Sequence, residues 1–101
     1  MMPAKMATIT EERVERYIQL TSKALDKAKI AAPESSFNRK LADDFMRMAR
    51  SYFQDARDFA AKGDLVNAFA CINYAHGWLD SGARIGLFDV GGDNRLFTLF
   101  E

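Results

Sequence analysis

The chain contains a single histidine, His76, and polar residues stand near it at helical spacing. Asp80 lies one turn after His76 and Asn73 lies nearly one turn before it. A histidine and an aspartate at i,i+4 are typical of a metal-ligand pair, or of a histidine held by a carboxylate for acid–base chemistry. Together with Asp55 and Arg84, these residues form a candidate ligand site.

A structural role for His76 competes with this chemical one. A catalytic metal normally needs three protein ligands, and no second histidine is present to help supply them. On the expected helix His76 falls at the centre of the apolar stripe. There it would be a buried histidine, hydrogen-bonded to a neighbouring acid or to a tyrosine hydroxyl. We favour this structural interpretation, and we predict no metal and no cofactor.

Other chemical motifs are missing from the sequence. There is no phosphate-binding P-loop, no dinucleotide fingerprint and no G-x-S-x-G nucleophile elbow. Gly91 and Gly92 suit a turn rather than a phosphate cradle, because no helix follows them. The single cysteine, Cys71, falls inside an expected helix on an apolar flank, which is typical of an inert thiol. These absences favour a non-enzymatic protein.

Length and charge further narrow the class of protein to which the chain can belong. With 101 residues the chain is expected to form one domain. Its 14 basic and 14 acidic residues give a net charge of zero, and no segment is strongly basic, which argues against nucleic-acid binding. No apolar run is long enough to cross a membrane, no signal peptide is recognisable, and a lone cysteine suits a reducing compartment. We therefore predict a soluble, cytoplasmic protein.

Hydrophobic periodicity predicts three amphipathic helices. The first is expected over residues 9–31, with Pro33 ending it. The second is expected over residues 36–62. The third is expected over residues 64–85, after a Gly63-Asp64 turn whose residues suit a helix end and the next N-cap.

Residues 86–101 are expected to form an irregular tail that packs on the bundle or on a partner. The sequence thus predicts an all-α fold, a three-helix up-and-down antiparallel bundle with a short irregular C-terminal tail. The central seam of this bundle is expected to contain Ile18, Leu25, Leu41, Phe45, Met48, Tyr52, Phe69, Ile72, His76 and Leu79.

Several large apolar residues lie outside the predicted central seam. Met46 and Phe53 widen the stripe of the second helix on one side, where either the third helix or a second subunit would cover them. Tyr74 and Trp78 are large aromatic residues on a helix flank, which interfaces favour. The candidate interface residues are Met46, Phe53, Tyr74, Trp78, Phe97 and Phe100.

These features lead to a non-enzymatic protein–protein interaction or assembly module as the first functional hypothesis. We expect it to form a homodimer or to be a subunit of a larger assembly. A second hypothesis is a small-molecule or metal-binding protein, or an enzyme, with its site around His76. A third is an RNA-binding accessory protein that uses the more basic first two helices.

The sequence also resembles a known family. The residues that carry the resemblance are SYFQDA (51–56), the run from Phe59 to Phe88 that contains YAHGWLDSG, and the pair Leu96-Phe97. In these segments the chain is similar to the archaeal domain of unknown function family 357. The resemblance implies a small helical protein, a three-helix bundle, an archaeal cytoplasmic source and no established activity. It brings no catalytic residues.

Overall fold

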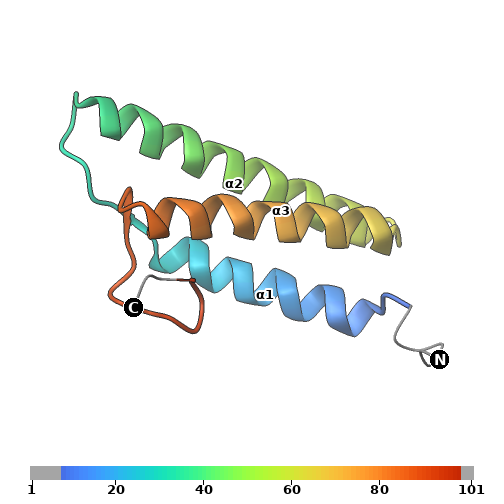
Figure 1. Ribbon diagram of the computed structural model, residues 1–101. Coiled ribbons are helices and arrows are strands. Elements are labelled where there is room, and N and C mark those ends of the chain that lie inside the picture. The colour runs from blue at the N-terminus through green and yellow to red at the C-terminus, as the bar shows by residue number, and fades with distance from the viewer. Residues whose placement is uncertain (1–7, 99–101) are drawn as a thin grey trace.

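The computed structural model describes residues 8–98, and over this range the chain forms three long helices. They are α1 (Glu11–Lys27), α2 (Phe37–Ala61) and α3 (Leu65–Arg84). Consecutive helices run in opposite directions, and α3 lies between α1 and α2 in the view of Figure 1. This arrangement confirms the predicted all-α up-and-down bundle. No helix in the described range is long and apolar enough to cross a membrane.

Each helix begins at a side-chain cap of the expected kind. The Thr10 hydroxyl accepts a hydrogen bond from the backbone N–H of Arg13 at 3.1 Å. Ser36 caps α2 in the same way, and Asp64 caps α3. Gly63 precedes Asp64 with a positive φ of 78°, which a side chain would make costly. These caps fix where α2 ends and α3 starts, so the hairpin between them is tight.

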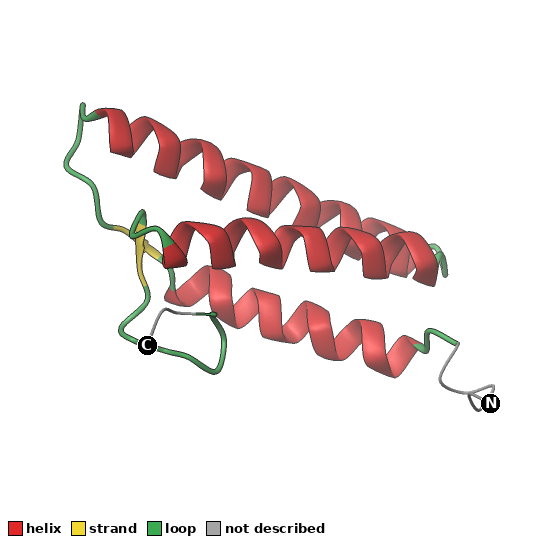
Figure 2. Cartoon of the chain, in the orientation of Figure 1, coloured by secondary structure: helices red, strands yellow, loops and turns green. Residues whose placement is uncertain are grey.

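The first helix is shorter than the periodicity predicts, ending at Lys27 rather than near residue 31. The next residues form strand β1 (Lys29–Ile30), which pairs antiparallel with strand β2 (Phe88–Asp89), as Figure 2 shows. The N–H of Ala31 also donates to the Leu87 carbonyl at 3.0 Å. Pairing with a distant segment overrides local helix propensity here, and sequence periodicity does not register that competition.

The core of α2 differs from the predicted seam. The fully buried residues of α2 are alanines spaced seven apart, and α3 has small buried residues at the same spacing. These residues are Ala42, Ala49 and Ala56 on α2, and Ala68, Ala75 and Gly82 on α3. The alanines let α2 and α3 approach closely, so little room is left between them for large side chains. Gly82 instead leaves room for the ring of Phe88.

The large residues of α2 therefore lie beside this contact rather than inside it. Leu41, Phe45, Met48 and Tyr52, all predicted as seam residues, are only partly buried. Phe37, at the start of the same stripe, is 73% exposed. The predicted seam holds for most of its residues on the other two helices, where Ile18, Leu25, Ile72 and Leu79 are buried. Phe69 and His76, also predicted as seam residues, are only partly buried.

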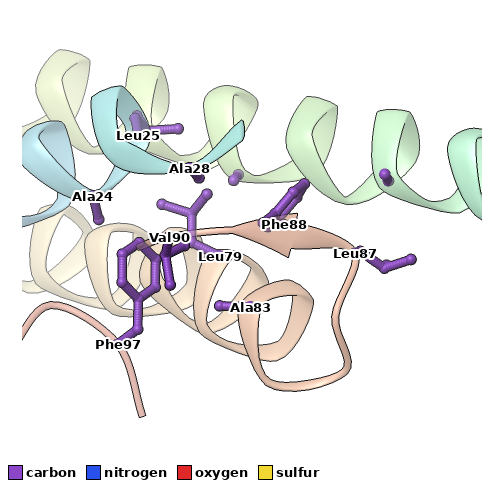
Figure 3. Packing of buried hydrophobic residues seen from close by; sticks show 11 residues of the cluster. Ala24, Leu25, Ala28, Leu79, Ala83, Leu87, Phe88, Val90 and Phe97 are labelled. Carbon is purple, nitrogen blue, oxygen red and sulfur yellow. The ribbon is translucent and has the colours of Figure 1, made fainter. Parts of the chain in front are cut away.

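The C-terminal segment packs on the bundle and completes its core, as predicted. Among its described residues, Leu87, Phe88, Val90 and Phe97 are buried. Figure 3 shows them packed with residues of α1 and α3, among them Leu25 and Leu79. The segment thus packs on the three helices as a fourth element of the fold, and its strand β2 is held by pairing with β1.

Candidate functional site

His76 lies at the junction of α1, α3 and the C-terminal segment, and both of its ring nitrogens are engaged. Nδ1 lies 3.1 Å from the hydroxyl oxygen of Thr21 on α1. Nε2 lies 2.7 Å from the carbonyl oxygen of Leu96. The imidazole also stacks on the ring of Phe97, with centroids 6.3 Å apart. One side chain therefore joins three parts of the fold.

These partners determine the tautomer of the neutral ring, that is, which of its two nitrogens carries the proton. A carbonyl oxygen can only accept a hydrogen bond, so Nε2 carries a proton and donates to Leu96. In the neutral ring Nδ1 then accepts from the Thr21 hydroxyl, which is buried. Neither nitrogen keeps a free lone pair for a metal. The geometry is that of a structural histidine, with a hydroxyl and a carbonyl in place of the predicted acid or tyrosine.

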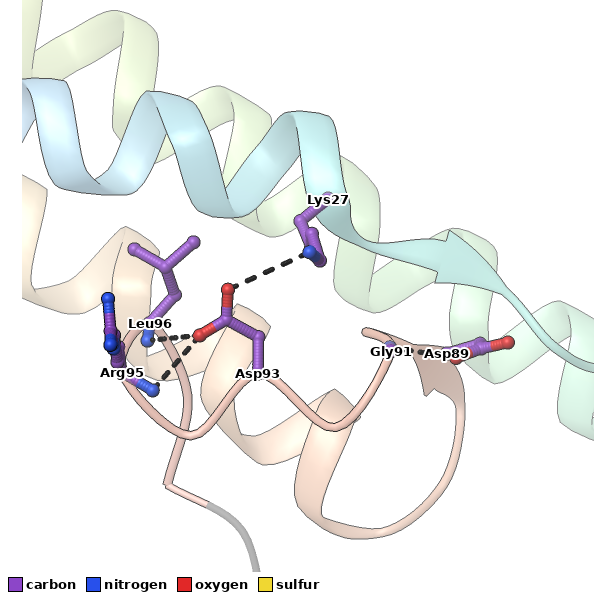
Figure 4. A network of polar contacts seen from close by, with 6 residues as sticks. All are labelled: Lys27, Asp89, Gly91, Asp93, Arg95 and Leu96. Atoms are coloured by element: carbon purple, nitrogen blue, oxygen red, sulfur yellow. Dashed lines mark hydrogen bonds and ion pairs between the residues drawn. The ribbon is translucent and has the colours of Figure 1, made fainter.

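Asp93 fixes the position of the Leu96 carbonyl. Its Oδ1 accepts the backbone N–H groups of Arg95 and Leu96, at 3.0 and 3.1 Å, and its Oδ2 lies 3.8 Å from Lys27 Nζ (Figure 4). The N–H of Leu96, then that of Arg95, lowers the pKa of the Asp93 carboxyl, and the charge of Lys27 acts in the same direction. The turn that presents Leu96 to His76 is thus held by an ionised carboxylate.

Asp80 and Arg84 both hold Thr98, further along the same segment. The Asp80 carboxylate accepts the backbone N–H of Thr98, and Nη1 of Arg84 donates to the Thr98 carbonyl at 3.4 Å. Both residues were predicted as ligand-site residues. In the structure, the hydrogen bonds described for these two side chains go to the backbone of their own chain.

Two shallow recesses adjoin His76. One, of about 440 Å³, lies between α3 and residues 94–98, and the other, of about 300 Å³, is bounded also by α1. His76 and Asp80 line both recesses, and Asn73 lines the second. Asp55 lines neither and is exposed on α2. Within residues 8–98, no three His, Cys, Asp or Glu side chains lie close enough together to hold a metal ion.

Cys71 is the one thiol of the chain, and it lies partly buried on α3. Desolvation raises its pKa, and the negative charges of Asp55 and Asp64 raise it further. A raised pKa leaves little thiolate at neutral pH, so this thiol is a poor nucleophile.

The candidate interface residues fall into two groups. Met46 and Phe53 are partly buried and pack against the core of their own chain. Phe97 is buried, whereas Tyr74 is 53% exposed and Trp78 is half-buried beside it. Phe100 lies outside the described residues. Of the described candidates, Tyr74 is therefore the most exposed aromatic residue, and Trp78 lies beside it.

Sequence reasoning missed the partners of His76. Thr21 had a detectable signal, because it is a polar residue in the apolar stripe of the first helix, as His76 is in the third. The Leu96 carbonyl had none, since every residue carries a carbonyl group. Arg95, which lines both recesses with His76, gave no signal either.

A family model described as protein of unknown function (DUF357) matches residues 16–88. The chain belongs to this family. The family match confirms the resemblance seen in the sequence, and it includes Thr21 and His76 but ends before Asp93, Leu96 and Phe97. No curated protein and no solved structure shows significant similarity to the chain.

Proposed function

We propose that this DUF357 protein is a non-enzymatic interaction module that pairs with a second copy of itself through one face of the α2–α3 hairpin. This aromatic face is defined by Phe45 and Tyr52 on α2, and by Tyr74, Gly77, Trp78 and Ser81 on α3.

The observation that carries this proposal is the lack of charge on α3. From Leu65 to Leu79 the helix has no Asp, Glu, Lys or Arg. An exposed helix face normally carries charged or polar residues, and a helix that is hydrophobic all round is normally buried. Yet one side of α3 faces solvent in the single chain, with Val66 68% and Tyr74 53% exposed. A second protein surface on this side would bury it.

Aromatic rings make this face energetically suitable. The rings of Tyr52 and Tyr74 meet edge to face with centroids 4.5 Å apart, and those of Phe45 and Trp78 do so at 5.0 Å. A recess of about 320 Å³ lies among Phe45, Tyr74 and Trp78. Rings that are already packed lose little side-chain entropy on binding, and Trp and Tyr are enriched at binding hot spots.

A second copy is the occupant that suits the charges of the chain. An uncharged surface is best covered by another uncharged surface, and each copy carries one. Two chains of zero net charge also do not repel each other at long range. A two-fold dimer uses the same patch on both chains, so one face supplies both sides of the interface.

Size-exclusion chromatography with light scattering tests this proposal. The wild-type chain is expected to elute at twice its monomer mass of 11.4 kDa. Tyr74→Glu places a carboxylate on the aromatic face and is expected to give the monomer. Ala61→Glu adds the same side chain at an exposed position on another side of the molecule, and should remain dimeric. A wild-type monomer at millimolar concentration would contradict the proposal.

A further inference from the structure

A long groove runs between α1 and α2, away from the aromatic face. It consists of two adjoining recesses of about 420 and 580 Å³ that share Glu15, Gln19 and Ala60 in their walls. We propose that this α1–α2 groove binds an amphipathic helix of another protein, one whose flank against α1 is basic. This partner is distinct from the second copy in the proposed dimer.

The groove exists because of how α1 is placed. α1 packs chiefly on α3 and much less on α2. Its Tyr17 meets Phe69 of α3 edge to face, with ring centroids 5.3 Å apart. Figure 1 shows α1 and α2 on either side of α3. The two recesses lie between residues 11–22 of α1 and residues 53–61 of α2.

The floor of the groove is apolar. Val14, Ile18, Phe53, Ala60 and Leu65 line it, and Val14 and Ile18 are buried while the others are partly exposed. Amphipathic helices bind proteins by laying their apolar stripe into grooves of this kind. The small side chain of Ala60 lets a helix backbone approach closely. A helix in this position would convert the three-helix bundle into a four-helix arrangement.

The rims of the groove carry charges that select the partner. On the α1 side the groove is lined by Glu11, Glu12 and Glu15, with Arg16 as the one cation among them. On the α2 side the only charged lining residue is Arg57, whose guanidinium lies 6.0 Å from the centroid of the Phe53 ring. A partner helix with lysine or arginine on its α1 flank, and an acidic flank towards Arg57, complements both rims.

Two designed peptides serve as probes. Both are amphipathic helices with the same Leu/Ala stripe. The first has lysines on one flank and glutamates on the other, and the second has glutamates on both flanks. The first peptide is expected to bind about tenfold more tightly by fluorescence anisotropy, from several weak ion pairs acting together. In ¹⁵N-resolved NMR titrations, the amide shifts should centre on Ile18, Gln19, Phe53 and Ala60.

Three variants distinguish peptide binding in the groove from dimerisation through the aromatic face. Glu15→Lys reverses a rim charge and should weaken binding of the Lys/Glu peptide about fivefold or more. Ala61→Glu should also weaken it, because Ala61 lines the groove. Tyr74→Glu, which targets the aromatic face, should leave peptide affinity unchanged, whether or not it alters the dimer.

Several outcomes would overturn the inference. One is equal affinity for the two peptides, since the rim charges would then have no effect. Another is the absence of shifts at millimolar peptide, and a third is shifts centred on Tyr74 and Trp78. A dimer that is broken by Ala61→Glu and not by Tyr74→Glu would assign the groove to a second copy, and would also overturn it.

Discussion

His76 ties three separate parts of the chain together, so its truncation should have a large effect on stability. His76→Ala removes the hydrogen bonds to Thr21 and Leu96 and leaves a part-buried carbonyl without its donor. We expect the free energy of unfolding to fall by about 1–3 kcal/mol. Urea denaturation at fixed protein concentration measures this, because m and the midpoint together give the free energy.

Asn94→Ala is a suitable control for His76→Ala. Asn94 is exposed, lies in the same segment as Leu96 and lines the same recess. Exposed substitutions usually change the free energy of unfolding by less than about 0.5 kcal/mol. If the two variants lose equal stability, His76 does not join the helices to the C-terminal segment.

Asp93 should make stability depend on pH in the acid range. Its pKa is lower in the folded chain than in the unfolded one, so the ionised carboxylate stabilises the fold. That contribution is complete above the unfolded pKa and is lost as pH falls through the folded pKa, which places the loss below about pH 4. Asp93→Asn should show a shallower fall in the free energy of unfolding over this range. Identical pH profiles for the two proteins would contradict this.

At the scale of single residues, the sequence singled out the unusual side chain and favoured a structural role for it, but it did not predict the partners of that side chain. His76 stood out because it is the only histidine of the sequence and lies in an apolar stripe. The carbonyl of Leu96 left no pattern, because the tail that carries it is irregular and has no periodicity. Asp55 was grouped with His76 by residue type alone, and the fold places it on α2 outside both recesses.

The two glycines inside α3 give opposite predictions for the same substitution. A Cβ at Gly82 would overlap the ring of Phe88, whereas one at Gly77 would have no neighbour within 4 Å. Gly82→Ala should therefore destabilise the fold by about 1–3 kcal/mol through overpacking. Gly77→Ala should stabilise it by up to about 1 kcal/mol through helix propensity, measured in the Tyr74→Glu background so that the proposed dimer face does not contribute.

Thermal and urea unfolding of both glycine variants test this contrast. Each variant adds one methyl group to the same helix, so propensity is matched and only the surroundings differ. Equal stabilisation by both substitutions would mean that Phe88 does not pack against α3 as the structure has it.

The C-terminal segment should behave as part of the core. Phe97 is 3% exposed in that segment, whereas Phe37 is 73% exposed at the start of α2. Phe97→Ala is expected to lower the free energy of unfolding by about 3–5 kcal/mol. Phe37→Ala should change it by less than about 0.5 kcal/mol. A loss below 1 kcal/mol for Phe97→Ala would show that the segment is only loosely attached.

At the scale of elements, periodicity located the helices but not the contacts between them. The stripe from Leu41 to Tyr52 was assigned to the core because its residues are large. The structure buries the adjacent alanines, since small residues allow α2 and α3 to pack closely. The row of small residues from Ala68 to Gly82 was visible in the sequence. Which helix it faces depends on tertiary packing that no single sequence pattern encodes.

The whole molecule presents two surfaces of different character. The aromatic face on α2 and α3 is uncharged, and the groove between α1 and α2 is apolar with charged rims. Placed on separate sides, they would let one small bundle pair with a second copy and hold a partner helix at the same time.

An isotope-filtered NOE experiment tests the dimer most directly. A sample mixed from labelled and unlabelled chains reports only contacts that cross from one copy to the other. We predict intermolecular NOEs from the ring protons of Tyr74 and Trp78 to residues of the same face, including Gly77. Cross-copy contacts that arise only from the α1–α2 groove, or none at all at millimolar concentration, would contradict the proposed face.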